Sequence, residues 1–555
     1  MGAFLRSLLF AAAAVAAQDA AAQTIYPVDR AEILAGAKFD LKVEFPGKPA
    51  SAAVTVNGED AAAFFGKPAE IIEGEDGGAN TAYWLRGVSM PKAGNFAIQA
   101  RTSDKTSKVV WEVFDAPKRT AKNVILFIGD GMSVAHRTAA RVLSKGLVEG
   151  RYGGELAIDD MPYMALVSTS GIDSLVTDSA NSMSAYTTGH KSCVHALGVY
   201  CASNKSNLDH PKVETIAELV KRRLGMSIGV VTNAEIEDAT PAGMVAHTRR
   251  RRDYEDIVKM FFDLKPDVIL GGGSSHFLPA AAGGKRKDGE DYVRKFEDAG
   301  YKFVATNAEL KAATAPGSNA TKLLGLFNTS NIDGALDRFF LKKGTVAKFP
   351  DQPDLTDQLQ AALSMLSKAE NGFLLMVESG SIDKYSHSLD WERAVYDTIM
   401  LDNAVRLAKD FAAAKDDTLI IVVADHAHPV SIIGTCDDDA PGTDARGKLR
   451  LHGDSKFPNY PAPNAEGYPA TIDVSRRIAF SFGGLLDHCQ EPLAMRREGT
   501  PPRPAGSGVH AADDVVLTAT GPGSEQFHGH IDNTRVFRYM ATALGLSRDG
   551  GAAGK

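Results

Sequence analysis

The sequence predicts an α/β protein whose central sheet is mostly parallel and flanked by helices, preceded by a small antiparallel β-sandwich. Three continuous apolar runs carry the prediction of a parallel sheet, because strands buried on both faces are apolar throughout. These runs are residues 124–128, 373–377 and 419–423. Carboxylate or histidine side chains follow each run, and ligands of such sheets bind beyond the carboxyl ends of the strands. Three such endings predict a site that holds more than one metal ion.

The first 22 residues have the pattern of a secretory signal peptide. They contain one basic residue, Arg6, followed by an apolar Leu/Ala/Val stretch and by small residues at Ala17 and Ala22, either of which could precede the cleavage point. The apolar stretch is too short to cross a bilayer comfortably, and no later segment reads as a membrane span. We therefore expect a periplasmic or secreted protein.

Residues 26–117 differ in pattern from the rest of the chain. Apolar and charged residues alternate over 39–45, as in a strand with one buried face. Similar short pieces follow at 53–56, 83–85, 96–98 and 109–114, separated by Gly, Pro and Asn. This spacing predicts an immunoglobulin-like β-sandwich, which offers no cluster of catalytic side chains.

Residues 121–548 alternate strand-like and helical patterns, which is typical of one large α/β domain. Further strands are predicted at 227–231 and 268–270. The alternation is interrupted at about 436–504 by a segment rich in Asp, Gly, Pro and Arg, which we interpret as an insertion. At 555 residues with 44% hydrophobic content, the chain is long enough for both this domain and the sandwich.

The four cysteines have no CxxC spacing, so they do not indicate a zinc site. In an exported chain an even number of cysteines suggests two disulfides, for which three pairings are open. We favour Cys193 with Cys201 and Cys436 with Cys489, because near neighbours need little chain closure. The formal net charge of −8 argues mildly against nucleic acid as a partner.

Potential metal ligands gather at the ends of the three apolar runs. Glu378 ends one run, and Asp383 and His387 follow it four residues apart, on one face of a predicted helix. Asp425 and His426 follow another run, with His428 two residues on, where we expect it to orient a ligand. Asp130 follows the remaining run, between two glycines that allow a close backbone approach.

Ser179 is the candidate nucleophile, at the start of a predicted helix. A serine in that position is most often an N-cap. It is also well placed to attack a phosphoryl group that faces the backbone N–H donors of a helix N-terminus. The local sequence alone does not separate these two roles.

Taken together, these motifs resemble the alkaline phosphatase family. The matching segments are IGDGM at 128–132, TDSA at 177–180, DATPA at 238–242, residues 378–387 and ADH at 424–426. They occur in the family's order over residues 122–546, and the N-terminal sandwich lies outside the resemblance. The fold implied is an alkaline-phosphatase-like α/β core.

The resemblance implies a role for each matching residue. Ser179 matches the nucleophile that becomes phosphoserine, and Arg251 the arginine that holds the substrate phosphate. Downstream Tyr254 selects Arg251 over its neighbours Arg250 and Arg252, and the spacing from Gly521-Pro522 selects His528 over His530. The implied ligands are Asp383, His387 and His528 for a first Zn²⁺, Asp425, His426, Asp130 and Ser179 for a second, and Asp130, Thr240 and Glu378 for Mg²⁺.

The resemblance therefore implies a phosphate monoester hydrolase that works through a phosphoserine with two zinc ions and one magnesium ion. Its partners would be small-molecule phosphate monoesters. A homodimer is a possible oligomeric state, which the sequence does not decide. The nearest alternative is a phosphodiesterase or nucleotide pyrophosphatase on the same scaffold, which typically uses threonine and lacks the magnesium site. A secreted binding protein without activity is a more distant alternative.

Overall fold

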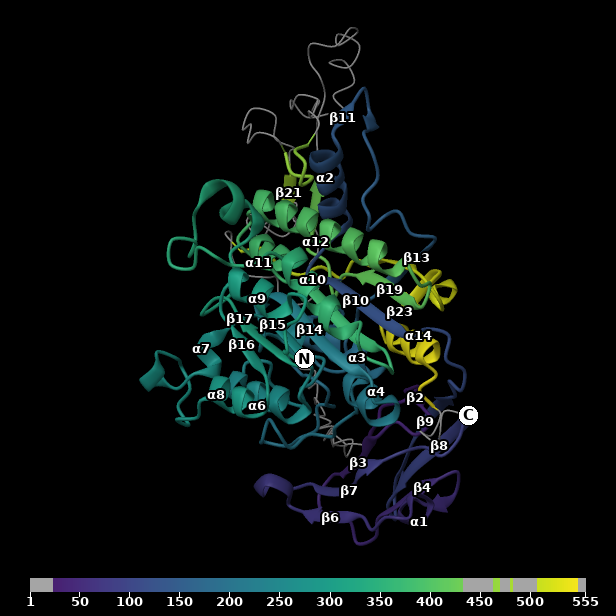
Figure 1. Ribbon diagram of the computed structural model, residues 1–555. Coiled ribbons are helices and arrows are strands. Elements are labelled where there is room, and N and C mark those ends of the chain that lie inside the picture. Colours follow the sequence, from purple (N-terminus) through teal and green to yellow (C-terminus); the bar gives the residue numbers. More distant parts are fainter. Residues whose placement is uncertain (1–22, 433–462, 470–479, 483–506, 548–555) are drawn as a thin grey trace, which may run out of the picture.

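The computed structural model describes residues 23–432, 463–469, 480–482 and 507–547 (Figure 1). The predicted signal peptide, most of the predicted insertion, Cys436 and Cys489 lie outside these residues. No helix in the described parts of the chain is long and apolar enough to cross a membrane.

A ten-stranded sheet forms the centre of the larger part of the molecule. The strands, in spatial order, are β16 (Lys302–Val304), β17 (Leu323–Leu326), β15 (Val268–Gly272), β14 (Ser227–Glu235), β18 (Phe373–Ser379), β10 (Asn123–Gly129), β19 (Thr418–Val423), β22 (Val515–Thr520), β13 (Tyr163–Ser168) and β23 (Gly529–Asp532). The three predicted apolar runs are β10, β18 and β19, and every residue of these strands is buried. They lie side by side in parallel register, with Ile128 opposite both Glu378 and Val423, so their carboxyl ends meet at one edge.

One strand reverses the direction of the sheet. β22 is antiparallel to both β19 and β13, whereas β23 is parallel to β13. The residues before β22 therefore lie at the edge where β19 ends, and Ala511 bridges to Ala427 there. The residues after β22 lie at the opposite edge.

Helices cover the sheet (Figure 1). α12 (Trp391–Ala412) and α10 (Leu355–Leu366) pack against the central strands, and α2 (Val134–Lys145) packs against α12. α3 (Ser179–Thr188) contacts α14 (Thr534–Leu544), and its ten residues are all buried. The other α-helices of the described residues are α1 (Ala61–Phe65), α4 (Ile216–Leu224), α5 (Ala239–Ala242), α6 (Tyr254–Leu264), α7 (Ser274–Phe277), α8 (Tyr292–Asp298), α9 (Asn307–Thr314) and α11 (Ser381–His387).

The N-terminal part consists of two small sheets packed face to face. One has the order β1 (Thr24–Tyr26), β3 (Phe39–Phe45), β7 (Thr81–Val88) and β6 (Glu70–Glu73); the other has β2 (Glu32–Leu34), β9 (Thr106–Phe114), β8 (Gly94–Arg101), β4 (Ala53–Val56) and β5 (Glu59–Asp60). Phe39 and Trp111 join the two layers with ring centroids 5.4 Å apart. The prediction of small antiparallel sheets is confirmed, except that β2 pairs with β9 in parallel.

These small sheets contact the segment between α3 and α4, which also borders the candidate site. The Asp40 amide donates to the carbonyl of Lys212 at 2.8 Å, and the buried Lys42 ammonium donates to Asn204 Oδ1 at 2.6 Å. The Tyr26 hydroxyl donates to the carbonyl of Cys201 at 2.8 Å. Cys201 forms a disulfide with Cys193, as predicted. The N-terminal part thus braces the segment that holds His195, whose amide donates to Asp178 Oδ1 at 3.0 Å.

Candidate active site

The acidic and histidine side chains predicted at the strand ends converge at one edge of the central sheet. Asp130 follows β10, Glu378 lies near the end of β18, and Asp425 and His426 follow β19; all four are buried. Gly131 makes the convergence possible, with a φ of +66° and an amide that donates to Asp425 Oδ1 at 3.0 Å. A Cβ at Gly131 would lie 2.6 Å from the His428 ring, so a side chain there would displace the cluster.

Helix α11 brings Asp383 and His387 to the same place. The spacing of four residues sets both side chains on one face of the helix, with His387 Nε2 3.3 Å from Asp383 Oδ1. His428 Nε2 lies 2.6 Å from Asp383 Oδ1. His428 therefore contacts a predicted ligand, as expected of a residue that orients it.

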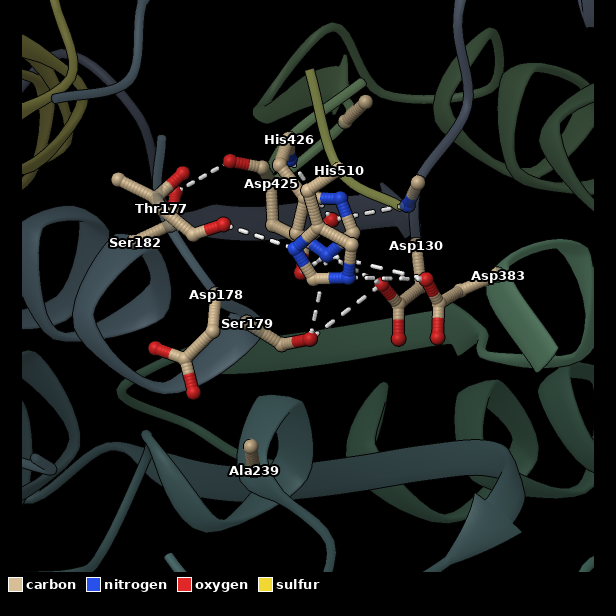
Figure 2. Close-up of polar contacts among 12 residues, drawn as sticks. Asp130, Thr177, Asp178, Ser179, Ser182, Ala239, Asp383, Asp425, His426 and His510 are labelled. Carbon is tan, nitrogen blue, oxygen red and sulfur yellow. Dashed lines mark hydrogen bonds and ion pairs between the residues drawn. The ribbon is translucent and has the colours of Figure 1, made fainter. Parts of the chain in front are cut away.

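The structure does not bring His528 to this cluster. His528 is exposed, between the short 3₁₀ helix η6 (Ser524–Gln526) and β23, at the edge of the sheet opposite the strand ends. His510, which the sequence analysis missed, lies in the cluster instead. Its Nε2 is 3.1 Å from His387 Nε2, and its ring stacks on that of His426 with centroids 3.6 Å apart (Figure 2). The assignment of His528 is therefore corrected to His510.

Hydrogen bonds fix which nitrogen of each imidazole is free. His510 Nδ1 is 2.8 Å from the carbonyl of Thr177, and His387 Nδ1 is 2.9 Å from the carbonyl of Gly508. Because a carbonyl only accepts, both Nδ1 atoms carry a proton, and Nε2 is the ring atom of each that faces the cluster. Burial lowers the pKa of His510 to about 3, so this imidazole is neutral at pH 7. Two imidazole Nε2 atoms that face each other beside the Asp383 carboxylate are the donor set of a cation site.

The buried carboxylates also need a positive partner. Burial raises the pKa of Asp130 well above its ordinary value, and neighbouring Asp425 and Asp383 raise it further. Burial likewise raises the pKa of Glu378 to about 7. Asp425 Oδ2 and Thr240 Oγ1 are buried without a hydrogen-bond partner among the described residues.

The potential ligand atoms form two compact groups, and within each group all atoms lie within 4.8 Å of one another. The first group is Asp383, His387, His428 and His510, and the second is Asp130, Asp383 and His426. Divalent cations fit this set of oxygen and nitrogen donors.

Ser179 is the first residue of α3, and its hydroxyl points to the same cluster (Figure 2). Its Oγ lies 3.3 Å from His426 Nε2 and 3.5 Å from Asp130 Oδ1. The N-cap of α3 is Asp178, whose carboxylate accepts from the amide of Asn181 at 3.2 Å. The capping role is thus taken by the preceding residue, and the Ser179 hydroxyl is free for chemistry.

Two carboxylates hold Arg251 next to the start of α3. Its Nη1 donates to Asp178 Oδ2 and its Nη2 to Asp238 Oδ1, both at 3.0 Å. Lys384 Nζ donates to the other oxygen of Asp238 at 2.6 Å. These cations hold the pKa of Asp238 well below its usual range even though burial opposes them. Arg250 and Arg252 are exposed, so Arg251 is the member of the arginine run that the fold directs to the site.

The third predicted set, Asp130, Thr240 and Glu378, comes from adjacent elements. The Asp130 amide donates to the carbonyl of Ser379, the neighbour of Glu378, at 3.3 Å. Glu378 Oε2 accepts a short hydrogen bond from the hydroxyl of Thr232. Thr240 lies on α5, which packs against both β14 and β18. The set offers oxygen donors alone, which Mg²⁺ prefers.

Comparisons with known proteins give a consistent result. The family model described as alkaline phosphatase matches residues 121–546. An alkaline phosphatase of Escherichia coli (strain K12) is 32% identical over 483 residues, which are 80% of this chain and 90% of that protein. The tissue-nonspecific alkaline phosphatase isozyme of Gallus gallus is 30% identical over 77% of this chain and 85% of its own.

Solved structures show the same fold. The crystal structure of Thermus thermophilus alkaline phosphatase superposes with a TM-score of 0.58 at 27% identity, covering 78% of this chain and 93% of that one. The alkaline phosphatase of the Antarctic bacterium TAB5 gives a TM-score of 0.57 at 21% identity, over 78% of this chain and 100% of its own.

Proposed function

This chain belongs to the alkaline phosphatase family and is a phosphatase, and on that premise we propose that it hydrolyses phosphate monoesters through a phosphoserine at Ser179. One observation carries the proposal. The Ser179 hydroxyl lies beside Asp130 and His426, and the preceding residue, Asp178, holds Arg251. A nucleophile and a phosphate-binding group are therefore brought together at the N-terminus of one helix.

We assign the cation ligands from the geometry and the family resemblance together. His510 replaces His528 in the first set. The proposed sets are Asp383, His387 and His510 for one Zn²⁺, Asp425, His426, Asp130 and Ser179 for a second, and Asp130, Thr240 and Glu378 for Mg²⁺. Bound divalent cations supply the positive charge that lowers the pKa of a hydroxyl or water and stabilises a leaving alkoxide.

The remaining steps belong to the chain's own residues. The planar guanidinium of Arg251, fixed by two carboxylates, binds two unesterified phosphate oxygens. The backbone N–H groups and the dipole at the start of α3 favour the same anion. The Ser179 oxygen, after losing its proton to solvent, bonds to phosphorus as the ester P–O bond breaks, and the released alkoxide takes a proton from solvent to leave as the alcohol. Water then cleaves the phosphoserine, which restores the hydroxyl and releases inorganic phosphate.

We expect the protein to prefer a monoester to a diester. A monoester dianion has three unesterified oxygens, so one remains for the cations when Arg251 binds two; a diester monoanion has only two and carries one negative charge fewer. The loss of one charge-assisted contact predicts a kcat/KM for p-nitrophenyl phosphate on the order of 10²-fold above that for bis-p-nitrophenyl phosphate. Parallel assays with excess Zn²⁺ and Mg²⁺ measure this ratio. A higher kcat/KM for the diester would instead identify a phosphodiesterase.

Arg251→Ala is expected to weaken phosphate recognition. The variant should lose about 10²-fold in kcat/KM for a monoester and bind inorganic phosphate more weakly as an inhibitor, because a charge-assisted fork is removed. Arg250→Ala is the matched control, since this exposed neighbour has the same charge and side chain. Steady-state kinetics and phosphate inhibition constants compare the two. An equal loss in Arg250→Ala would show that the wrong arginine has been assigned.

A periplasmic or secreted location remains our proposal. It rests on the pattern of residues 1–22, which lie outside the described residues. The Cys193–Cys201 disulfide supports it, because disulfides persist in oxidising compartments.

A further inference from the structure

A second group of potential ligands lies outside the site described above. Glu235 ends β14, Glu237 follows it in the loop to α5, and His276 lies on α7, beyond the end of the neighbouring strand β15. One ligand atom from each of the three residues lies within 4.8 Å of the others. None of them belongs to the cation sets proposed above.

Glu237 is the unusual member of this group. Its side chain is 0% exposed, and within the described parts of the chain neither carboxylate oxygen has a hydrogen-bond partner. A buried carboxylate in that state is costly, and native structures leave few such groups unsatisfied. Burial raises the pKa of Glu237 well above its usual range, and neighbouring Glu235 raises it further. The carboxyl group must therefore either keep its proton or bind a cation.

Among the residues that the structure describes, no side chain supplies Glu237 with a charge partner at contact distance. His276 Nε2 is 3.9 Å from Glu237 Oε1, beyond hydrogen-bonding reach. Burial lowers the pKa of His276 to about 4, helped by Lys285 and Arg286, so this imidazole is neutral at pH 7 and offers a lone pair. Lys285 acts on Glu237 only as a more distant charge, without an ion pair between them among the described residues. The donor atoms of Glu235, Glu237 and His276 are therefore arranged like the ligands of a cation site and not like an ion pair.

The surrounding chain holds the three side chains in place. Gly273 has a φ of +88°, and a Cβ there would lie 2.3 Å from Glu237 Oε2, so only glycine lets the carboxylate approach the backbone. Ser330 Oγ donates to Glu235 Oε1 at 2.7 Å, which leaves the other oxygen of Glu235 for a ligand. The His276 ring packs edge-to-face against Tyr254, with centroids 4.8 Å apart.

We propose that Glu235, Glu237 and His276 form an additional divalent-cation site, with Zn²⁺ as the best-fitting ion. One imidazole nitrogen and two carboxylate oxygens are a donor set that zinc accepts, and a fourth position stays open to water. The cation would join the loop after β14 to the loop after β15. The first of these loops continues into Asp238, which holds Arg251, so the site would stabilise a segment that borders the active site.

Zinc content per chain tests the proposal directly. The full-length protein and its Glu237→Gln variant are equilibrated with buffered free Zn²⁺ and excess Mg²⁺, and bound zinc is measured by mass spectrometry. The wild-type protein is expected to carry one zinc per chain more than the variant. Glu297→Gln, an exposed position on α8, controls for the loss of one negative charge and should keep the full zinc content.

His276→Ala provides a second variant, because its partly exposed side chain is easier to remove without disturbing the core. It should lose the same equivalent of zinc, and crystals of the wild-type protein should show an anomalous zinc peak between His276 and Glu237. Equal zinc content in the wild-type protein, Glu237→Gln and His276→Ala would overturn the proposal and identify Glu237 as a protonated buried acid. That result would leave the proposed phosphatase mechanism untouched.

Discussion

Ser179→Ala is expected to lose the phosphoenzyme and to lower kcat for monoesters on the order of 10³-fold or more, with the bound metals retained. The fold places the Ser179 hydroxyl both beside the carboxylate and histidine cluster and at the start of α3. Alanine at this position removes the nucleophile, yet every other proposed ligand keeps its side chain. Trapping with radiolabelled phosphate at acid pH, followed by peptide mass spectrometry, measures the loss.

A control for this prediction lies in the same helix. Ser184 is equally buried, but its hydroxyl donates to the carbonyl of Ala180 within α3 at 2.9 Å. Ser184→Ala should therefore keep a trappable phosphoserine even if it costs some stability. A labelled peptide from Ser179→Ala, or wild-type turnover in that variant, would remove Ser179 from the mechanism.

The central strands were predictable because their burial is complete. A strand covered on both faces must be apolar at every position, so β10, β18 and β19 stand out in the sequence, and their polar endings mark the edge of the sheet. Ser179 was harder to assign, since a serine before a helix is usually its cap. In the structure Asp178 caps α3, so the Ser179 hydroxyl does not serve as the cap. A carboxylate immediately before the serine is itself a preferred N-cap, and it is the sequence signal that the serine need not cap the helix.

The proposed cation site of Glu235, Glu237 and His276 has no recognisable signal in the sequence. Glu235 and Glu237 resemble ordinary loop residues, and His276 is 39 positions beyond Glu237 in the chain. Only the parallel register of β14 with β15 brings the two loops together. The contact between Lys42 and Asn204, which joins the N-terminal sheets to the rest, is long-range in the same way. Contacts of this kind depend on topology, which local patterns do not encode.

His510 lies in the candidate site and His528 does not, because β22 runs in the reverse direction. The spacing from Gly521-Pro522 selects His528 in the sequence, and that criterion does not depend on strand direction. Because β22 runs antiparallel to β19, its start lies at the edge that carries Asp425, and its end lies at the other. His510 precedes β22 by a few residues, and the bridge between Ala511 and Ala427 holds it beside His426.

His510→Ala is therefore expected to weaken zinc binding at least 10- to 100-fold and to lower monoester hydrolysis in parallel, because a direct ligand matters at least as much as the groups that orient one. The geometry supports a direct role for His510 in zinc binding, because Nε2 of His510 and Nε2 of His387 both face the carboxylate of Asp383. Zinc titration with a competing chelator measures the affinity, and activity is assayed at each free zinc concentration. His528→Ala is the matched control and should behave as the wild-type protein, since its exposed side chain lies at the far edge of the sheet. The opposite pattern, with zinc lost in His528→Ala and kept in His510→Ala, would contradict the strand direction on which the site is built.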